Sequence, residues 1–188
     1  MGKAQNWYLQ GWEYEDRLGE KRTNPRRVLV YKGDYYSFRL SSAGLKRLKV
    51  CFLCLTLVLL TVYIAGFFLN ARRFLFAPAG IPYSLAIIPL IYLVIGVCSL
   101  LTAKEPLTYR AYFGAVKRTR WAADFGAALL AVAVVGQIIY LFQYGAGWAA
   151  DDWFLAGNIL CTVLLTIMLL LFRRFPAKLL PQKNEKRI

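Results

Sequence analysis

The 188-residue sequence contains no histidine, and only ten acidic residues stand against 24 basic ones. Without histidine, the chain lacks the commonest general base, Ser-His and Cys-His nucleophile pairs, and His-containing metal sites. It also lacks carboxylate pairs within its apolar segments, a Gly-rich phosphate loop and a lipid-attachment motif. We therefore expect a protein that is not an enzyme and that binds neither a cofactor nor a metal ion.

Cysteine is sparse, and its placement excludes two common roles. All four cysteines fall inside apolar segments, so they do not form the disulfide framework of a small secreted domain. Cys51 and Cys54 form a single C-x-x-C pair, whereas structural zinc needs four ligands. We interpret the cysteines as small apolar side chains.

Apolar residues are abundant and are separated from charge along the chain. The composition is 59% hydrophobic, yet the net charge is +14, a combination atypical of a soluble domain. An uncharged helix of twenty residues covers roughly 30 Å, the thickness of the hydrocarbon core of a bilayer. The pattern predicts an all-α integral membrane protein with four transmembrane helices in a bundle (residues 42–172), after a leader (1–41) and before a basic tail (173–188). The predicted spans are 50–69, 83–103, 122–142 and 153–172.

Basic residues alternate in number from one side of these spans to the other. Segments 1–49, 104–121 and 173–188 carry 11, 5 and 6 Lys or Arg, whereas segments 70–82 and 143–152 carry two and none. Because basic residues concentrate in cytoplasmic loops, this pattern predicts a cell-membrane protein with both termini and the middle loop in the cytoplasm. Arg72 and Arg73 are the exceptions.

The second half of the leader has the pattern of a β-hairpin. Two β-prone runs flank a Gly-Asp pair within residues 27–40, and glycine suits a two-residue turn. Residues 1–24 are left unassigned. Because an isolated hairpin is marginally stable, we expect this one to lie on the protein's own cytoplasmic loop or on lipid headgroups. The alternative is that its free edge pairs with a strand of a partner protein.

Helix-capping residues predict where two helices begin. Ser41 can cap a first helix that starts in the cytoplasm near Ser42. Thr108 can cap a helix that has Tyr109 and Tyr112 on an apolar face, and the third helix can then run on to Phe142. A basic amphipathic helix beside a span is typical of an interfacial segment. We expect contacts with anionic lipid from the basic residues beside the first and third spans; the alternative is a solvated loop. These residues are Arg110, Lys117, Arg118, Arg120, Lys46, Arg47 and Lys49.

The third span is rich in small residues, and the segment before the second span is rich in proline. Small side chains let helix backbones approach closely, so we expect the third span at the centre of the bundle, or alternatively at a homodimer face. Segment 70–82 is too apolar for a solvated loop and too interrupted by proline for a helix, which predicts a position in the outer interface. Pro89 predicts a kink in the second span.

Polar residues are scarce within the spans. Gln137 and Asn158 each lie five residues from the external end of their helix, so they share one depth in the membrane. We favour a hydrogen bond that joins the third and fourth helices over a contact with a substrate. Asp151 and Asp152 are placed to cap the fourth span, and Asp124 to meet Arg118 or Arg120.

These patterns favour a non-enzymatic scaffold, accessory or regulatory subunit that acts through its basic cytoplasmic face. The alternative is a subunit of a small-solute or lipid transporter or channel, working as an oligomer, with a path lined by Gln137, Asn158, Thr162 and Thr166. We expect anionic lipid headgroups as partners, with another membrane protein or a second copy as candidates. Nucleic acid is not expected, because orientation and anionic lipid account for the basic charge.

Overall fold

The computed structural model describes residues 12–18, 25–31, 33, 35–38, 40–69, 71–145 and 149–180. Four helical stretches are long and apolar enough to cross a membrane, which confirms the predicted number. These stretches are Ser42–Phe67, Ala77–Thr102, Tyr109–Tyr144 and Ala149–Arg174. The first is α1 and the last is α7, while the second comprises α3 (Ala77–Leu85) and α4 (Ile87–Thr102). The third comprises α5 (Tyr109–Tyr112), a π-helical turn (Phe113–Lys117) and α6 (Arg118–Tyr144).

Both predicted capping residues act as helix caps. The Ser41 side chain accepts a hydrogen bond from the backbone N–H of Gly44 at 3.1 Å, and α1 begins at Ser42. The Thr108 side chain accepts from the backbone N–H of Ala111 at 3.4 Å. Each hydroxyl satisfies a first-turn donor that has no partner within its own helix. The helix beginning at Tyr109 then continues to Tyr144 without a break, as expected for the third span.

The segment before the second span is helical, so the prediction of a non-helical 70–82 is wrong. It forms α2 (Arg72–Leu75) and the start of α3. Pro78 lies in the first turn of α3, where a backbone N–H needs no intrahelical acceptor. Pro82 lies inside α3 and costs it one hydrogen bond. The helix is interrupted at Ala86. Because Pro89 has no backbone N–H, the carbonyl of Leu85, four residues earlier, lacks its usual helical donor at this point.

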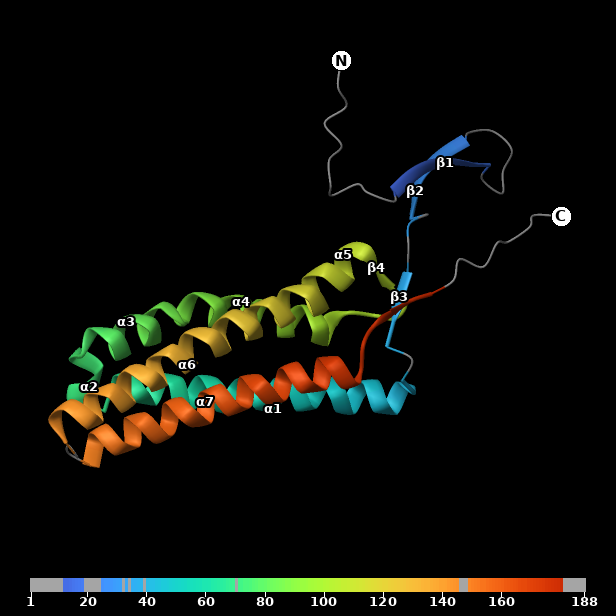
Figure 1. The fold of residues 1–188 in the computed structure, drawn as a ribbon. Helices are drawn as coiled ribbons and strands as arrows, with labels where there is room; N and C mark the ends of the chain where they lie inside the picture. Colours follow the sequence, from blue (N-terminus) through green and yellow to red (C-terminus); the bar gives the residue numbers. More distant parts are fainter. Residues whose placement is uncertain are drawn as a thin grey trace, which may run out of the picture.

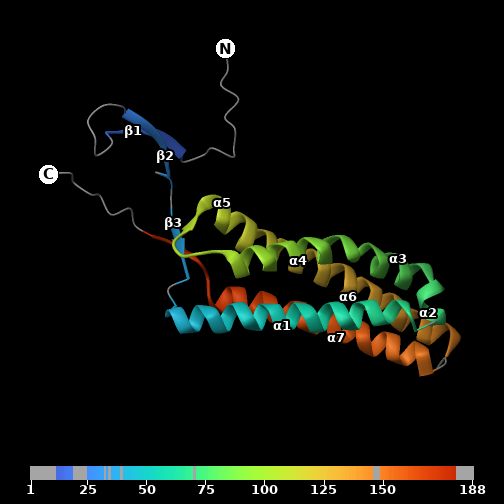
Figure 2. The ribbon, with the colours of Figure 1, turned by 180° about the vertical axis from the view of Figure 1, so that it is seen from behind.

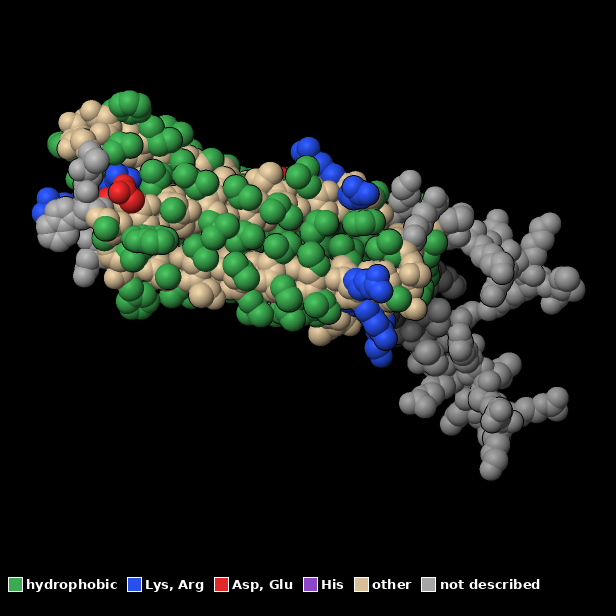
Figure 3. All heavy atoms as spheres, turned by 90° about the horizontal axis from the view of Figure 1, so that it is seen from below, with side chains coloured by type: hydrophobic (Ala, Val, Ile, Leu, Met, Phe, Trp, Pro, Cys, Tyr) green, Lys and Arg blue, Asp and Glu red, His purple; other side chains and the backbone are tan. Residues whose placement is uncertain are grey.

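The helix rich in small residues packs against the second and fourth spans, and it is not singled out as the centre of the bundle, because α1 also packs against these two spans. Helix α6 contacts α3, α4 and α7, while α1 contacts α7 and α4. The long helices lie alongside one another (Figures 1 and 2). At Gly136 of α6, an added Cβ would lie 2.3 Å from the carbonyl oxygen of Pro78, so only glycine permits this approach of α6 to α3. Hydrophobic side chains cover the middle of the face seen in Figure 3, and Lys and Arg side chains gather at its two ends.

The strands do not form the predicted hairpin over residues 27–40. Strand β2 (Pro25–Tyr31) pairs antiparallel with β1 (Trp12–Leu18), which lies within the segment that the sequence left unassigned. Strand β3 (Tyr35–Ser37) instead lies at the centre of a second sheet, between β4 (Leu107–Thr108) and β5 (Lys178–Leu179). The seven-residue pairing of β1 with β2 offers more ladder hydrogen bonds than the three residues of β3 can supply.

Candidate functional site

The second sheet joins three distant parts of the chain at one end of the helices, which we call the sheet end (Figure 1). Tyr36 of the leader pairs with Leu107, from the loop between the second and third spans, and with Leu179, which follows the fourth span. The backbone N–H of Phe38 donates to Glu105 Oε1 at 2.9 Å, and the Phe38 side chain is buried. This part of the leader therefore lies on the protein's own loop, one of the two expected supports.

Aromatic stacking adds a side-chain contact to this sheet. The Tyr36 ring stacks on the Tyr112 ring, with centroids 4.2 Å apart and planes 7° apart. The Tyr109 ring centroid lies 6.4 Å from that of Tyr36. The predicted apolar face of the helix after Thr108 therefore contacts the leader, and the helix itself is the first part of the third span. Aromatic pairs at such distances add about 0.5–1.5 kcal/mol beyond their buried area.

The basic residues predicted to contact lipid lie near the sheet end in different surroundings. Lys46 and Arg47 are exposed on the first turns of α1, and Arg110 is exposed at the start of α5. The Lys49 ammonium group instead donates to the carbonyl oxygens of Leu101 (3.2 Å) and Ala103 (2.6 Å). It thus compensates the free carbonyls at the C-terminus of α4 and the negative end of its dipole.

The other three predicted basic residues follow one another along the third span. Arg120 lies 4.0 Å from Asp124 one turn later, as the sequence suggested for this acid. The Lys117 ammonium lies over the Phe113 ring, 5.3 Å from its centroid, in a cation–π contact. Arg118 is half-buried and forms no ion pair among the residues that the structure describes.

Gln137 and Asn158 both lie in the interior, on α6 and α7. Their exposed fractions are 0% and 1%, and these two helices pack together. The side-chain nitrogen and oxygen atoms of both residues have no hydrogen-bond partner among the described residues, so the predicted interhelical bond between them is not formed. Thr162 and Thr166 donate to backbone carbonyls of their own helix, those of Asn158 and Thr162.

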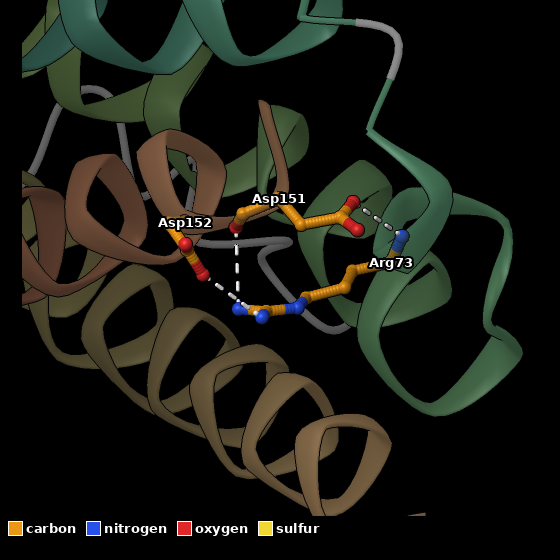
Figure 4. A network of polar contacts seen from close by, with 3 residues as sticks. All are labelled: Arg73, Asp151 and Asp152. Atoms are coloured by element: carbon orange, nitrogen blue, oxygen red, sulfur yellow. Dashed lines mark hydrogen bonds and ion pairs between the residues drawn. The ribbon is translucent and has the colours of Figure 1, made fainter. Parts of the chain in front are cut away.

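The end opposite the sheet contains a buried charge network that sequence reasoning missed. Arg73 of α2 and Asp151 of α7 are both fully buried. The Arg73 guanidinium donates to the backbone carbonyl of Asp151 at 3.2 Å and to Asp152 Oδ1 at 3.0 Å, and its backbone N–H donates to Asp151 Oδ1 at 3.2 Å (Figure 4). The buried guanidinium is thus paired with Asp152, while Arg73 Nε and Asp151 Oδ2 have no hydrogen-bond partner among the described residues.

A signal for this network was present in the sequence. Arg73 was one of two basic residues on the predicted external side, and Asp151 and Asp152 were the two acids there. From the sequence alone, both acids are expected to cap the fourth helix. In the structure α7 begins at Ala149, so both acids lie inside its first turn and face α2. The pairing required knowing that the two loops touch, which charge counts alone do not provide.

The described residues offer few groups for catalysis. No three His, Cys, Asp or Glu residues within the described ranges are close enough to hold a metal ion. Cys51, Cys54 and Cys98 are exposed on their helices, while Cys161 is buried, and all four are free thiols. The distinctive features are thus the joined segments at the sheet end, the unpaired amides and the charge network. Comparison with protein family models, with curated proteins and with solved structures finds no match.

Proposed function

We propose that the chain is a four-helix bundle in the cell membrane, with both termini in the cytoplasm, that works as a non-enzymatic scaffold, accessory or regulatory subunit. The observation that supports this proposal is the sheet β4-β3-β5, which joins leader, middle loop and tail on one surface. These are the three segments that the charge pattern assigns to the cytoplasm. A surface built from separate segments offers a partner one defined shape, with exposed basic side chains beside it.

The opposite end supports the same orientation. Arg72 and Arg73 were the two exceptions to the predicted charge distribution, and the structure brings Arg73 onto Asp151 and Asp152. Two basic and two acidic residues give this end a formal charge of zero. The basic excess of the protein therefore belongs to the side that carries the sheet, which is the side expected to face the anionic cytoplasmic leaflet.

Recovery of partners after crosslinking tests the scaffold proposal. The full chain is crosslinked in its native membranes and purified, and the proteins that accompany it are identified. We expect the same partner repeatedly, and we expect Tyr36→Ala, which removes the stack on Tyr112, to weaken its recovery. Leu75→Ala is the matched control, because Leu75 is 84% exposed at the opposite end. A protein recovered alone in every experiment contradicts the proposal.

A second candidate, a small-solute transporter or channel subunit, is favoured by the unpaired amides of Gln137 and Asn158. Polar groups without partners in a membrane interior are costly, so their retention suggests a contact made during function. A flux assay in proteoliposomes tests this candidate with Gln137→Leu and Asn158→Leu. Thr61→Val is the control, because Thr61 is exposed on α1 and bonds only to its own helix among the described contacts. Flux that persists unchanged in both Leu variants contradicts the role of this pair.

A further inference from the structure

An apolar groove lies on the outside of the helix bundle, between the second and third spans. It has a volume of about 750 Å³ and lies between α4 and α6. Its floor includes Pro89 and Ala122, which are buried, and its rim includes Ile88, Tyr92 and Phe125, which are more than half exposed. Because proline and alanine are shorter than the rim side chains, the helix pair leaves a furrow that faces the bilayer. Its size falls within the range of pockets that hold small organic ligands.

A second, more polar cavity continues from this groove toward the sheet end. It has a volume of about 1040 Å³ and shares Phe113 and Arg118 with the groove. Its other lining residues include the hydroxyl side chains of Ser99, Thr102 and Thr108. The two cavities adjoin at these shared residues, with an apolar lining along the spans and a more polar lining where the spans end.

The charge at the junction of the two cavities has one sign. Lys117 and Arg118 line the groove, Arg110 and Arg118 line the polar cavity, and neither lining contains an Asp or Glu. Within the described part of the chain, Lys117 and Arg118 form no ion pair. The Lys117 ammonium is instead held over Phe113, at the boundary between the apolar and the polar cavity. Guanidinium and ammonium groups placed in this way suit a phosphate group.

The length of the groove suits an acyl chain. From Lys117 to Leu129 the third span rises about 18 Å, at 1.5 Å per residue. Half of a hydrocarbon core of about 30 Å is about 15 Å. On the third span the groove begins at Lys117, near the sheet end, and on the second span it reaches Leu85, close to the opposite end of the predicted span 83–103. A groove of this length accommodates an extended acyl chain, and the basic side chains Lys117 and Arg118 near its sheet end favour an anionic lipid over a helix of a second copy.

We propose that this site binds one anionic glycerophospholipid of the leaflet at the sheet end. Its acyl chain lies in the groove over Pro89 and Ala122, and its phosphate contacts Arg118 and Lys117. The proposal rests on the orientation given under the proposed function, because the sheet end must face the leaflet that carries anionic lipid. The proposal names the class of lipid and the place where it binds, whereas the sequence predicts only that basic residues contact anionic lipid.

Native mass spectrometry of the full chain tests this site. The protein is purified in detergent with equal amounts of phosphatidylglycerol and phosphatidylcholine that carry the same acyl chains. We expect preferential retention of one phosphatidylglycerol. The double variant Lys117→Gln/Arg118→Gln should reduce that retention roughly 30-fold, the equivalent of about 1 kcal/mol for each basic residue near an anionic group. Arg173→Gln/Arg174→Gln is the matched control, because both residues are exposed near the same end and outside both linings.

A groove-filling variant separates the acyl-chain site from charge attraction alone. Ala122→Phe fills the floor and should reduce retention of both lipids, whereas Val132→Phe, on an exposed position of the same helix, should not. Equal retention of the two lipids by the wild-type protein, or a lipid-free dimer in which the groove is an interface between copies, overturns the proposal. Neither result affects partner recovery in the crosslinking experiment. Conversely, a chain without protein partners contradicts the scaffold function and leaves lipid retention unchanged.

Discussion

At the scale of single residues, Arg73 is a side chain whose substitution should destabilise the protein. It is fully buried, and it holds α2 against the first turn of α7 through Asp151 and Asp152. Arg73→Gln should destabilise the protein by about 1–3 kcal/mol, because the buried carbonyl of Asp151 loses its charged donor and Asp152 loses its ion pair. Thermal unfolding of the purified protein in detergent measures this effect.

Arg72→Gln is the matched control for that substitution. Arg72 is the preceding residue of the same short helix, and its side chain is exposed. It loses the same charge, so a general effect of charge at this end of the bundle would lower both melting temperatures equally. The buried network predicts a large decrease for Arg73→Gln and a small one for Arg72→Gln. Equal decreases would show that the network does not stabilise the protein.

Gln137 and Asn158 give opposite predictions under two hypotheses. A hydrogen bond between the two side chains would make each substitution by Leu destabilising. Among the residues that the structure describes, their amide atoms have no partners, so replacement by an apolar side chain of similar size removes a desolvation cost of about 1–3 kcal/mol per group. We therefore expect Gln137→Leu to keep or raise the melting temperature in detergent. A clear decrease would instead support the interhelical bond.

At the scale of helices, glycine positions test the packing of α6 on its neighbours. Gly136→Ala would place a Cβ 2.3 Å from the carbonyl oxygen of Pro78, so backbone must move. We expect a loss of about 1–3 kcal/mol, typical of overpacking in a well-packed core. Gly114→Ala is the control on the same span, because nothing lies within 4 Å of its added Cβ.

The control has its own expected direction. Alanine favours a helix over glycine by about 1 kcal/mol, so Gly114→Ala should be neutral or stabilising. The difference in melting temperature between the two variants then reports the contact between α3 and α6 alone. If Gly136→Ala were as stable as Gly114→Ala, the close approach of α6 to Pro78 would be contradicted.

Elements set by local sequence were predictable, and elements set by distant contacts were not. The four spans follow from apolar length, and the starts of α1 and α5 follow from Ser41 and Thr108. The start of α3 was missed, because proline was counted as a breaker although Pro78 occupies a first turn that tolerates it. The predicted hairpin failed because β3 pairs with residues about 70 and 140 positions away, which no local pattern reveals.

The same distinction separates the candidate sites. The basic residues of the third span were identified from helical periodicity, but their grouping around a groove lined by Pro89 and Ala122 depends on how α4 and α6 pack. The Arg73 network likewise needs the contact between α2 and α7. Charge pattern locates a surface, whereas the cavity that gives it specificity arises from packing.

At the scale of the whole molecule, the sheet makes a prediction about topology. Because β3 pairs with both β4 and β5, the leader, the middle loop and the segment after the fourth span must lie on one side of the membrane. The proposed orientation identifies that side as the cytoplasm. Cysteine labelling can test both statements in a background from which the four native cysteines have been removed.

Single cysteines at exposed positions report the two ends separately. Ser42→Cys, Lys104→Cys and Pro176→Cys lie at the sheet end, and Leu75→Cys lies at the opposite end. In intact cells, a membrane-impermeant maleimide should label only Leu75→Cys, and the other three should react after permeabilisation. If only the three sheet-end positions were labelled, the three segments would still share one side of the membrane, but that side would be the outside of the cell. A split among those three would contradict the sheet itself, because its strands cannot pair across a bilayer.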